Sequence, residues 1–168
     1  MADEIEKKYL VTDSADIQKM VKSFKTTNIT QAYLEVGDTE RRVRSKGDKY
    51  FYTVKQKKSA DGLIRAENER EISKEEFEQG LKEHIGNIID KTRTKVPLGD
   101  DLYAELDIYK GELQGLLSVE VEFPNEEAVG KFQAPAWFGA DVTADKRYKN
   151  QNLAMNGLPK QQQGSTKA

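Results

Sequence analysis

Acidic side chains in this sequence recur at a spacing that suits metal binding. Carboxylates two residues apart lie on the same face of a β-strand, because successive strand side chains point to opposite faces. Such pairs repel each other unless a cation joins them, and divalent cations prefer oxygen ligands. The acidic positions are Glu4, Glu6, Glu67, Glu69, Glu71, Glu105, Asp107, Glu120 and Glu122.

Basic side chains show the same spacing, mostly on other segments. Phosphate groups join basic pairs well, and arginine offers phosphate two parallel hydrogen bonds. The basic positions are Lys8, Arg42, Arg44, Lys55, Lys91 and Arg93. Six cations match a triphosphate, whose charge near neutrality is about −4 to −5. The two sets together indicate a site for a polyanion bridged by a divalent cation.

A simpler interpretation is a sheet with one apolar face and one solvated, charged face, which explains the alternation on any single strand. Random surface patterning mixes both signs within a strand, whereas here acidic and basic strands are largely separate. A sheet closed into a barrel would bring both sets to one lumen. The apolar faces would then point outward, beneath the helices.

Composition limits the class of protein. The 168 residues carry a formal net charge of −2, with 36% hydrophobic and 33% charged residues, so a strongly basic nucleic-acid binder is not expected. The absence of cysteine excludes thiol catalysis and cysteine-bound zinc, and the single histidine, His84, excludes a histidine-rich metal site. We expect any metal to bind carboxylates, and we expect a cytoplasmic protein with no membrane partner, because the sequence has neither an apolar span nor a signal peptide.

The sequence predicts about eight strands with helices between them. Period-two patterns predict strands over 4–11, 31–36, 41–44, 50–55, 64–72, 88–96, 102–109 and 116–123. Helices are expected after Ser14, after Ser73 with Glu76 as a capping box, after Asn125, and over 151–155. Gly86 is the expected stop of the second helix. We expect His84 and Trp137 to have structural roles, and Tyr33 to pack in the sheet.

These motifs, in this order, resemble the CYTH superfamily of triphosphate tunnel metalloenzymes. The opening Glu4-Ile5-Glu6-Lys7-Lys8 is similar to the family's ExExK motif, except that Lys7 replaces the commoner arginine. The resemblance continues through the RxR motif at Arg42–Arg44, the lysine strand at Lys55, the ExE motif at Glu69–Glu71 and the KxR motif at Lys91–Arg93. It ends with two late acidic strands, at Glu105–Asp107 and Glu120–Glu122, and with the C-terminal segment 137–154.

The resemblance implies an α+β fold, an eight-stranded antiparallel β-barrel around a tunnel with helices packed outside. It implies hydrolysis of triphosphates with Mg²⁺ or Mn²⁺. The implied metal ligands are Glu4, Glu6, Glu120, Glu122 and Asp107. The implied catalytic residues are Glu4, Glu6, Lys8, Glu69 and Glu71. The implied substrate-binding residues are Lys8, Arg42, Arg44, Lys55, Lys91 and Arg93.

The first expectation is an inorganic triphosphatase, which converts tripolyphosphate to pyrophosphate and phosphate, with nucleoside triphosphates as further candidate substrates. A class IV adenylate cyclase or a thiamine triphosphatase would use the same tunnel, but no base-binding motif or aromatic platform is evident. A non-catalytic polyphosphate or nucleotide sensor is the alternative from another class. We expect one barrel domain over 1–157, a flexible tail over 158–168, and a monomer or homodimer.

Overall fold

The computed structural model describes residues 2–159, and all eight predicted strands are present in this range. The predicted tail over 158–168 falls mostly outside the described residues. The strands are β1 (Ala2–Leu10), β2 (Thr26–Glu35), β3 (Thr39–Lys46), β4 (Lys49–Lys57), β5 (Ile64–Ile72), β6 (Ile85–Gly99), β7 (Leu102–Tyr109) and β8 (Leu117–Phe123). The helices are α1 (Ala15–Ser23), α2 (Lys74–Lys82), α3 (Glu126–Lys131) and α4 (Asn150–Asn156), with 3₁₀ turns η1 (Gly111–Leu113) and η2 (Lys146–Tyr148).

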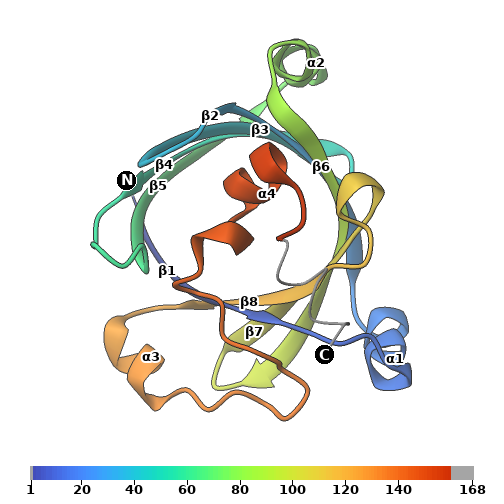
Figure 1. The fold of residues 1–168 in the computed structure, drawn as a ribbon, viewed down its shortest axis with the longest axis vertical. Helices are drawn as coiled ribbons and strands as arrows, with labels where there is room; N and C mark the ends of the chain where they lie inside the picture. Colours follow the sequence, from blue (N-terminus) through green and yellow to red (C-terminus); the bar gives the residue numbers. More distant parts are fainter. Residues whose placement is uncertain (1, 160–168) are drawn as a thin grey trace.

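The strands form one closed antiparallel barrel in the order β1-β5-β4-β3-β2-β6-β7-β8, which confirms the predicted fold class. Figure 1 looks into the ring that they make. Closure depends on β1, which pairs with β5 through its first half and with β8 through its second half. Every strand therefore has two neighbours, and each has one face toward the lumen.

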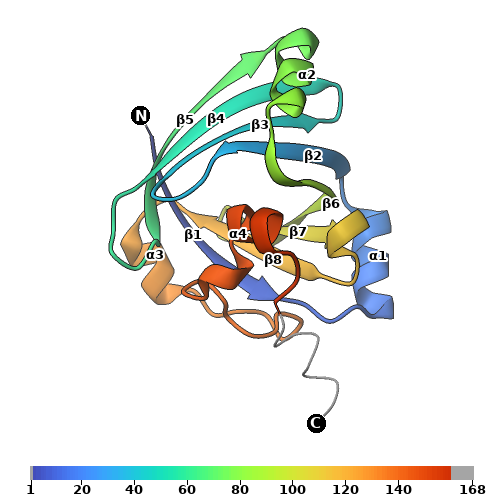
Figure 2. The ribbon, with the colours of Figure 1, turned by 45° about the horizontal axis from the view of Figure 1, so that its top comes forward.

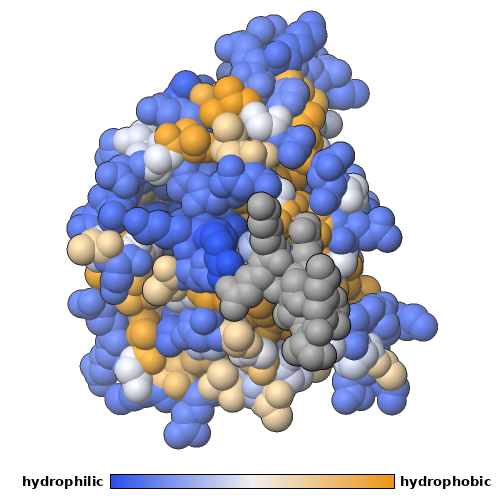
Figure 3. Space-filling model, viewed as in Figure 1, coloured by the Kyte–Doolittle hydropathy of each residue, from blue (hydrophilic) through white to orange (hydrophobic). Residues whose placement is uncertain are grey.

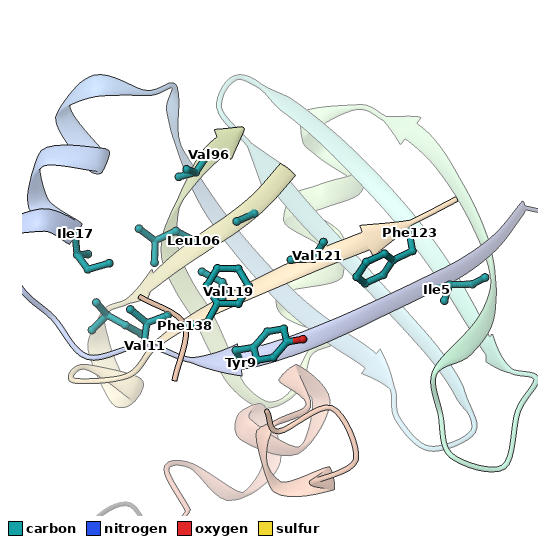
Figure 4. Packing of buried hydrophobic residues seen from close by; sticks show 12 residues of the cluster. Ile5, Tyr9, Val11, Ile17, Val96, Leu106, Val119, Val121, Phe123 and Phe138 are labelled. Atoms are coloured by element: carbon teal, nitrogen blue, oxygen red, sulfur yellow. The ribbon is translucent and has the colours of Figure 1, made fainter. Parts of the chain in front are cut away.

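The apolar side chains lie on the outside of the barrel, as the alternation predicts. Figure 4 shows Ile5 and Tyr9 of β1 beside Val119, Val121 and Phe123 of β8, all in one buried cluster. Their neighbours in sequence, at the other parity, face the lumen. This first hydrophobic cluster is thus a layer between the barrel and the segments that cover it.

The covering segments complete this core on three sides. Ile17 of α1 is fully buried against the first cluster, and Phe138 packs beside Tyr9 with ring centroids 4.8 Å apart. On another side, Phe77 of α2 packs against Tyr50 of β4. Figure 2 shows α1, α2 and α3 outside the strands. These positions agree with the prediction of helices packed outside the barrel.

Helix α4 is an exception to that prediction. It lies across one end of the barrel, within the ring of strands in the view of Figure 1. Leu153 and Ala154 are buried in a second apolar cluster that includes Tyr33, Ile89 and Tyr109 of the barrel. The Tyr109 hydroxyl also donates a 2.6 Å hydrogen bond to Asn150 at the start of α4. This helix therefore closes one end of the lumen instead of covering an outer face.

The predicted helix caps form with one correction. Ser14 and Asn125 each accept a hydrogen bond from a backbone N–H three residues later, and Ser73 with Glu76 forms a capping box. Gly86, however, is not the stop of α2, because the helix ends at Lys82 with Glu83 as its C-cap. Gly86 belongs to β6, where its φ of +66° and its close approach to Ala154 favour glycine.

The segment after α3 is attached to the end of β1 by backbone hydrogen bonds. Gly139 N–H donates to the Leu10 carbonyl at 2.7 Å, and Leu10 N–H donates to the Ala140 carbonyl at 2.9 Å. Farther along, Leu158 packs against the second apolar cluster. The expected domain boundary at 157 stays a prediction, and residues 160–168 lie outside the described range.

Gly139→Ala is expected to destabilise the fold. A Cβ at this position would lie 2.6 Å from the Leu10 carbonyl oxygen, so the backbone must shift and the two hydrogen bonds must weaken. We expect a loss of about 1–3 kcal/mol in the free energy of unfolding, measured by urea denaturation.

Gly130→Ala in α3 is the matched control. A Cβ there meets nothing within 4 Å, so the variant should be more stable by about 1 kcal/mol or less, because alanine favours helix over glycine. Equal stability of the two variants would contradict the close approach at Gly139.

Candidate functional site

The order of the strands gathers the lumen charges into two halves. The predominantly acidic strands β7, β8, β1 and β5 are consecutive around the ring, and the predominantly basic strands β4, β3 and β6 follow, with β2 between β3 and β6. Within the acidic half, Glu6 lies opposite Glu122 and Glu105 lies opposite Glu120 in register. The closed sheet thus makes one wall predominantly anionic and the other predominantly cationic.

The lumen contains a cavity of about 230 Å³. Charged side chains from seven strands line it, with Gln31 and Tyr33 from β2 and part of the segment that leads into α4. The charged lining residues are Glu4, Glu6, Lys8, Glu40, Arg42, Arg44, Lys46, Lys55, Arg65, Glu67, Glu69, Lys91, Arg93, Glu105, Glu120, Glu122 and Lys149.

Arg42 and Arg44 of β3 are the cations best placed to receive an anion. Both side chains are buried, and the Nε atom of each has no hydrogen-bond partner within residues 2–159. Burial and the nearby charges of Arg42 and Arg93 lower the pKa of Arg44 to about 10. A buried donor without a partner is costly, so this wall is suited to a ligand rich in acceptor oxygens.

Lys91 and Arg93 of β6 are held by Asp107, which lies opposite Arg93 on β7. The Asp107 carboxylate accepts from Lys91 Nζ at 2.8 Å and from Arg93 at 2.7 and 2.8 Å. Burial together with Arg93 lowers the pKa of Lys91 to about 8, in spite of Asp107. Arg93 also donates to Glu120 at 2.7 Å, so it connects the two halves.

Glu4 of β1 is engaged by cations. It accepts hydrogen bonds from Lys55 Nζ at 3.0 and 3.1 Å and from Arg65 at 2.9 Å. Burial alone would raise the pKa of Glu4, but Lys55 and Arg65 lower it to about 2. Glu4 is therefore a carboxylate at neutral pH, and its charge fixes the position of both cations.

The half-buried Glu6 and the buried Glu120 are neighbouring carboxyl groups. Burial, followed by repulsion from Glu120 and Glu4, raises the pKa of Glu6 well above its ordinary value. Burial also opposes the charge of Glu120, but Arg93, Lys8, Lys91 and a hydrogen bond from Glu6 hold its pKa well below the ordinary value. The crowding of negative charge thus favours the protonated form of Glu6 beside the Glu120 carboxylate, whereas Arg65, which donates to Glu6 at 3.1 Å, favours the charged form.

Glu122 adds a third carboxyl group to this wall. Burial and repulsion from Glu4, Glu105 and Glu67 raise its pKa to about 7. A divalent cation would relieve the repulsion among these carboxyl groups, so the chemistry of this donor set fits a hard metal ion. Within the described part of the chain, no three carboxylate or histidine side chains already surround a metal-sized point.

Most of the residues predicted for the site line the cavity together, and two do not. Glu71 is exposed and lies outside the lining, beyond Glu69 on β5. Asp107 is fully buried behind the wall, where Lys91 and Arg93 occupy both of its oxygens. The structure thus makes Asp107 a residue that positions two cations of the wall.

The sequence analysis missed Arg65 and Glu40 as wall residues. Arg65 contacts Glu4, Glu6 and Glu40, and Glu40 is also paired with Arg42. Extending the acidic alternation of β5 back by two residues reaches Arg65, and extending the basic alternation of β3 back by two reaches Glu40. Both were overlooked because their charge is opposite to that of their strand.

Comparison with known proteins agrees with this geometry. The family model described as CYTH domain matches residues 2–147. An inorganic triphosphatase of Nitrosomonas europaea is 39% identical over 155 residues, which are 91% of this chain and 97% of that protein. An inorganic triphosphatase of Acetivibrio thermocellus is 37% identical over 158 residues, 93% of this chain and 96% of that protein.

A crystal structure of an inorganic triphosphatase is similar with a TM-score of 0.66 and 36% identity, over 95% of this chain and 99% of that one. No helix within residues 2–159 is long and apolar enough to cross a membrane. The similarities to the family model and to the triphosphatases extend over nearly the whole barrel, and they include the strands that carry both halves of the wall.

Glu122→Gln is expected to change how stability depends on pH in metal-free buffer. The folded-state pKa of Glu122 is raised from 4.5 to about 7, so the folded protein binds this proton more tightly than the unfolded chain. This tighter proton binding adds to the free energy of unfolding. The contribution is complete below the pKa of the unfolded chain, 4.5, and is lost as pH rises through about 7. Glutamine mimics the protonated form.

We therefore expect the variant to melt above the wild type at about pH 8.5 and at the same temperature at about pH 4. Thermal unfolding in the presence of a chelator measures this difference. Glu78→Gln, at an exposed position on α2, is the control for loss of one charge and should show no such difference between the two pH values. A wild type that remains the more stable at high pH would contradict the repulsion around Glu122.

Proposed function

Because the chain belongs to the CYTH domain family, we propose that it is a metal-dependent inorganic triphosphatase that hydrolyses tripolyphosphate to pyrophosphate and orthophosphate. The main structural support is the division of one lumen into an acidic and a basic half. A metal–triphosphate complex carries positive and negative groups side by side, and such a wall can meet both. A nonspecific anion site needs only the basic half.

The substrate is proposed to lie against the basic half. Arg42 and Arg44 have guanidinium groups that face the cavity, and their unpartnered Nε donors support contacts to phosphate oxygens. Further positive charge comes from Lys55 of β4, from Lys91 and Arg93 of β6, and from Lys8 of β1 across the lumen. The proposal gives these residues the task of holding two phosphates while the third is transferred to water.

The acidic half is proposed to hold the metal through Glu4, Glu6, Glu120 and Glu122. When bound, Mg²⁺ or Mn²⁺ neutralises charge on the phosphates and orients the attacking water. Glu6 would bind the metal as a carboxylate, and Arg93 holds Glu120 in place. Glu69 accepts hydrogen bonds from Arg44 and Thr53 and so orients Arg44, and its implied catalytic role remains part of the proposal.

The reaction balances without any further reactant. The oxygen of water bonds to a terminal phosphorus, the bridging P–O bond breaks, and orthophosphate separates from pyrophosphate. The proton lost by water passes to the solvent or to a free carboxylate of the wall. We further propose a cytoplasmic enzyme, a monomer or homodimer, that binds no nucleic acid.

A turnover assay tests the activity directly. The protein is supplied with tripolyphosphate, ATP or thiamine triphosphate, each with Mg²⁺ or Mn²⁺, and phosphate, pyrophosphate and cyclic AMP are measured. We expect phosphate and pyrophosphate from tripolyphosphate at the highest kcat/KM, and no product in the presence of a chelator. Cyclic AMP from ATP would indicate a cyclase. Tight binding of all three with no turnover would indicate a sensor.

Glu6→Gln is expected to reduce kcat by about two orders of magnitude or more, because it removes an ionisable ligand from the metal site. It should also weaken metal binding, measured as the Mg²⁺ concentration for half-maximal activity. Glu71→Gln on the exposed end of β5 is the matched control, and we expect its kcat to stay within about twofold of the wild type since Glu71 does not line the cavity. Equal losses in both variants would contradict the proposed site.

Arg44→Ala is expected to act mainly on substrate binding. Loss of a charge-assisted contact to phosphate should raise KM for tripolyphosphate about 10- to 100-fold. Arg41→Ala is the control, because Arg41 on the same strand faces outward and pairs with Glu35. An unchanged KM for Arg44→Ala would remove this residue from the binding wall.

A further inference from the structure

A second cavity opens beside the tunnel, between β3–β5 and the segment that leads into α4. Its volume is about 190 Å³, and we call it the side pocket. Figure 3, in the same view as Figure 1, shows strongly hydrophilic residues gathered between the upper left and the centre, where β3–β5 and α4 lie in Figure 1. Its lining residues are Gly37, Asp38, Glu40, Lys55, Lys57, Arg65, Lys146, Lys149, Gln151 and Asn152.

The charge of the side pocket is unbalanced. Five cationic side chains line it against two carboxylates, and the carboxylates are only partly available. Glu40 is paired with Arg42 inside the tunnel, and the exposed Asp38 is 3.9 Å from Lys57. No carboxylate of the described residues lies within ion-pair distance of Lys146 or Lys149. Lys55 and Arg65 are already paired with carboxylates of the tunnel, among them Glu4. The unneutralised positive charge of the side pocket therefore lies with Lys146 and Lys149, beside the loosely paired Lys57.

Lys149 shows the effect of this crowding. Its amino group lies against Gly62, where a Cβ would be only 2.9 Å from Nζ. Burial and then the charges of Arg65, Lys146 and Lys57 lower the pKa of Lys149. A bound anion would offset both the burial of the Lys149 amino group and its repulsion by the neighbouring cations, because it supplies hydrogen-bond acceptors and negative charge.

The wall of the side pocket is fixed by hydrogen bonds between distant segments. Gln151 is buried, accepts from Gly37 N–H at 2.6 Å and donates to the Gly37 carbonyl at 3.3 Å. Asn152 donates to the Lys146 carbonyl at 2.6 Å. These contacts hold the turn after β2, η2 and α4 together, so the backbone around the cations is set before any ligand binds.

We propose that the side pocket is a second anion-binding site that takes a phosphate group. It adjoins the tunnel, since Glu40, Lys55, Arg65 and Lys149 line both cavities. The phosphate can be free orthophosphate or a distal group of a longer polyphosphate whose end lies in the tunnel. Only the second source rests on the proposed triphosphatase function.

Lys57→Ala/Lys146→Ala tests the site, because these two lysines line the side pocket and not the tunnel. Orthophosphate is titrated into the metal-free protein at constant ionic strength, with sodium chloride as the reference, and backbone amide NMR shifts are followed. We expect phosphate to shift Gly37 and Asn152 in the wild type, with about fivefold or greater weakening in the variant. Lys19→Ala/Lys22→Ala on α1 removes the same charge elsewhere and should bind as the wild type does.

Charge-preserving variants separate binding from folding. Lys57→Arg/Lys146→Arg should retain the phosphate-dependent shifts if the cations hold the anion. The proposal is overturned if sodium chloride gives the same shifts as phosphate, if the alanine variant binds as the wild type does, or if the arginine variant loses binding together with the alanine variant. None of these results depends on hydrolysis.

The two sources are distinguished by kinetics. If distal phosphates occupy the site, the alanine variant should raise KM for long-chain polyphosphate about fivefold and leave KM for tripolyphosphate unchanged. If free orthophosphate is the ligand, both KM values stay unchanged while the NMR difference remains. A wild type without any turnover would refute the proposed function alone, because the NMR titration still decides the binding site.

Discussion

The attraction between opposite charges across a closed lumen is the interaction on which the rest of this structure depends. Buried charges are stable only when they are paired and hydrogen-bonded. The strand order places most carboxylates on one contiguous wall and most cations on the other, so neighbours within a wall repel each other. Arg93, between Asp107 and Glu120, and Lys55, against Glu4, join the two walls.

That arrangement determines where the hydrophobic core can be. Since the lumen is polar, apolar residues occupy the outer faces of β1, β6, β7 and β8, and the chain must cover them. Helices α1 and α3 and the segment around Phe138 do so, and Gly139 lets this segment approach Leu10 closely. A composition of 36% hydrophobic residues is enough because the core is a thin outer layer.

The sequence predicted the strands and most of the wall because a period of two is a direct consequence of strand geometry. Closure into a barrel was expected from the segregation of charge and from family resemblance, and it is confirmed. The position of α4 could not be predicted, since the pattern of a short helix does not say which surface it covers. Asp107 was assigned to the metal by the family resemblance, and that assignment stays a prediction, because the alternation gives the face of a side chain and not its partners. Its pairing with Lys91 and Arg93 depends on neighbouring strands.

The wall recognises charge density and has few means of recognising an organic group. Tyr33 and Tyr148 are the aromatic residues among the described residues that line the cavity, and both side chains are buried. Stacking on a nucleobase needs an exposed aromatic face, which these rings do not offer. Binding energy must therefore come from phosphate and metal contacts. This constraint favours a compact polyphosphate over a nucleotide, because a base would add size without adding contacts.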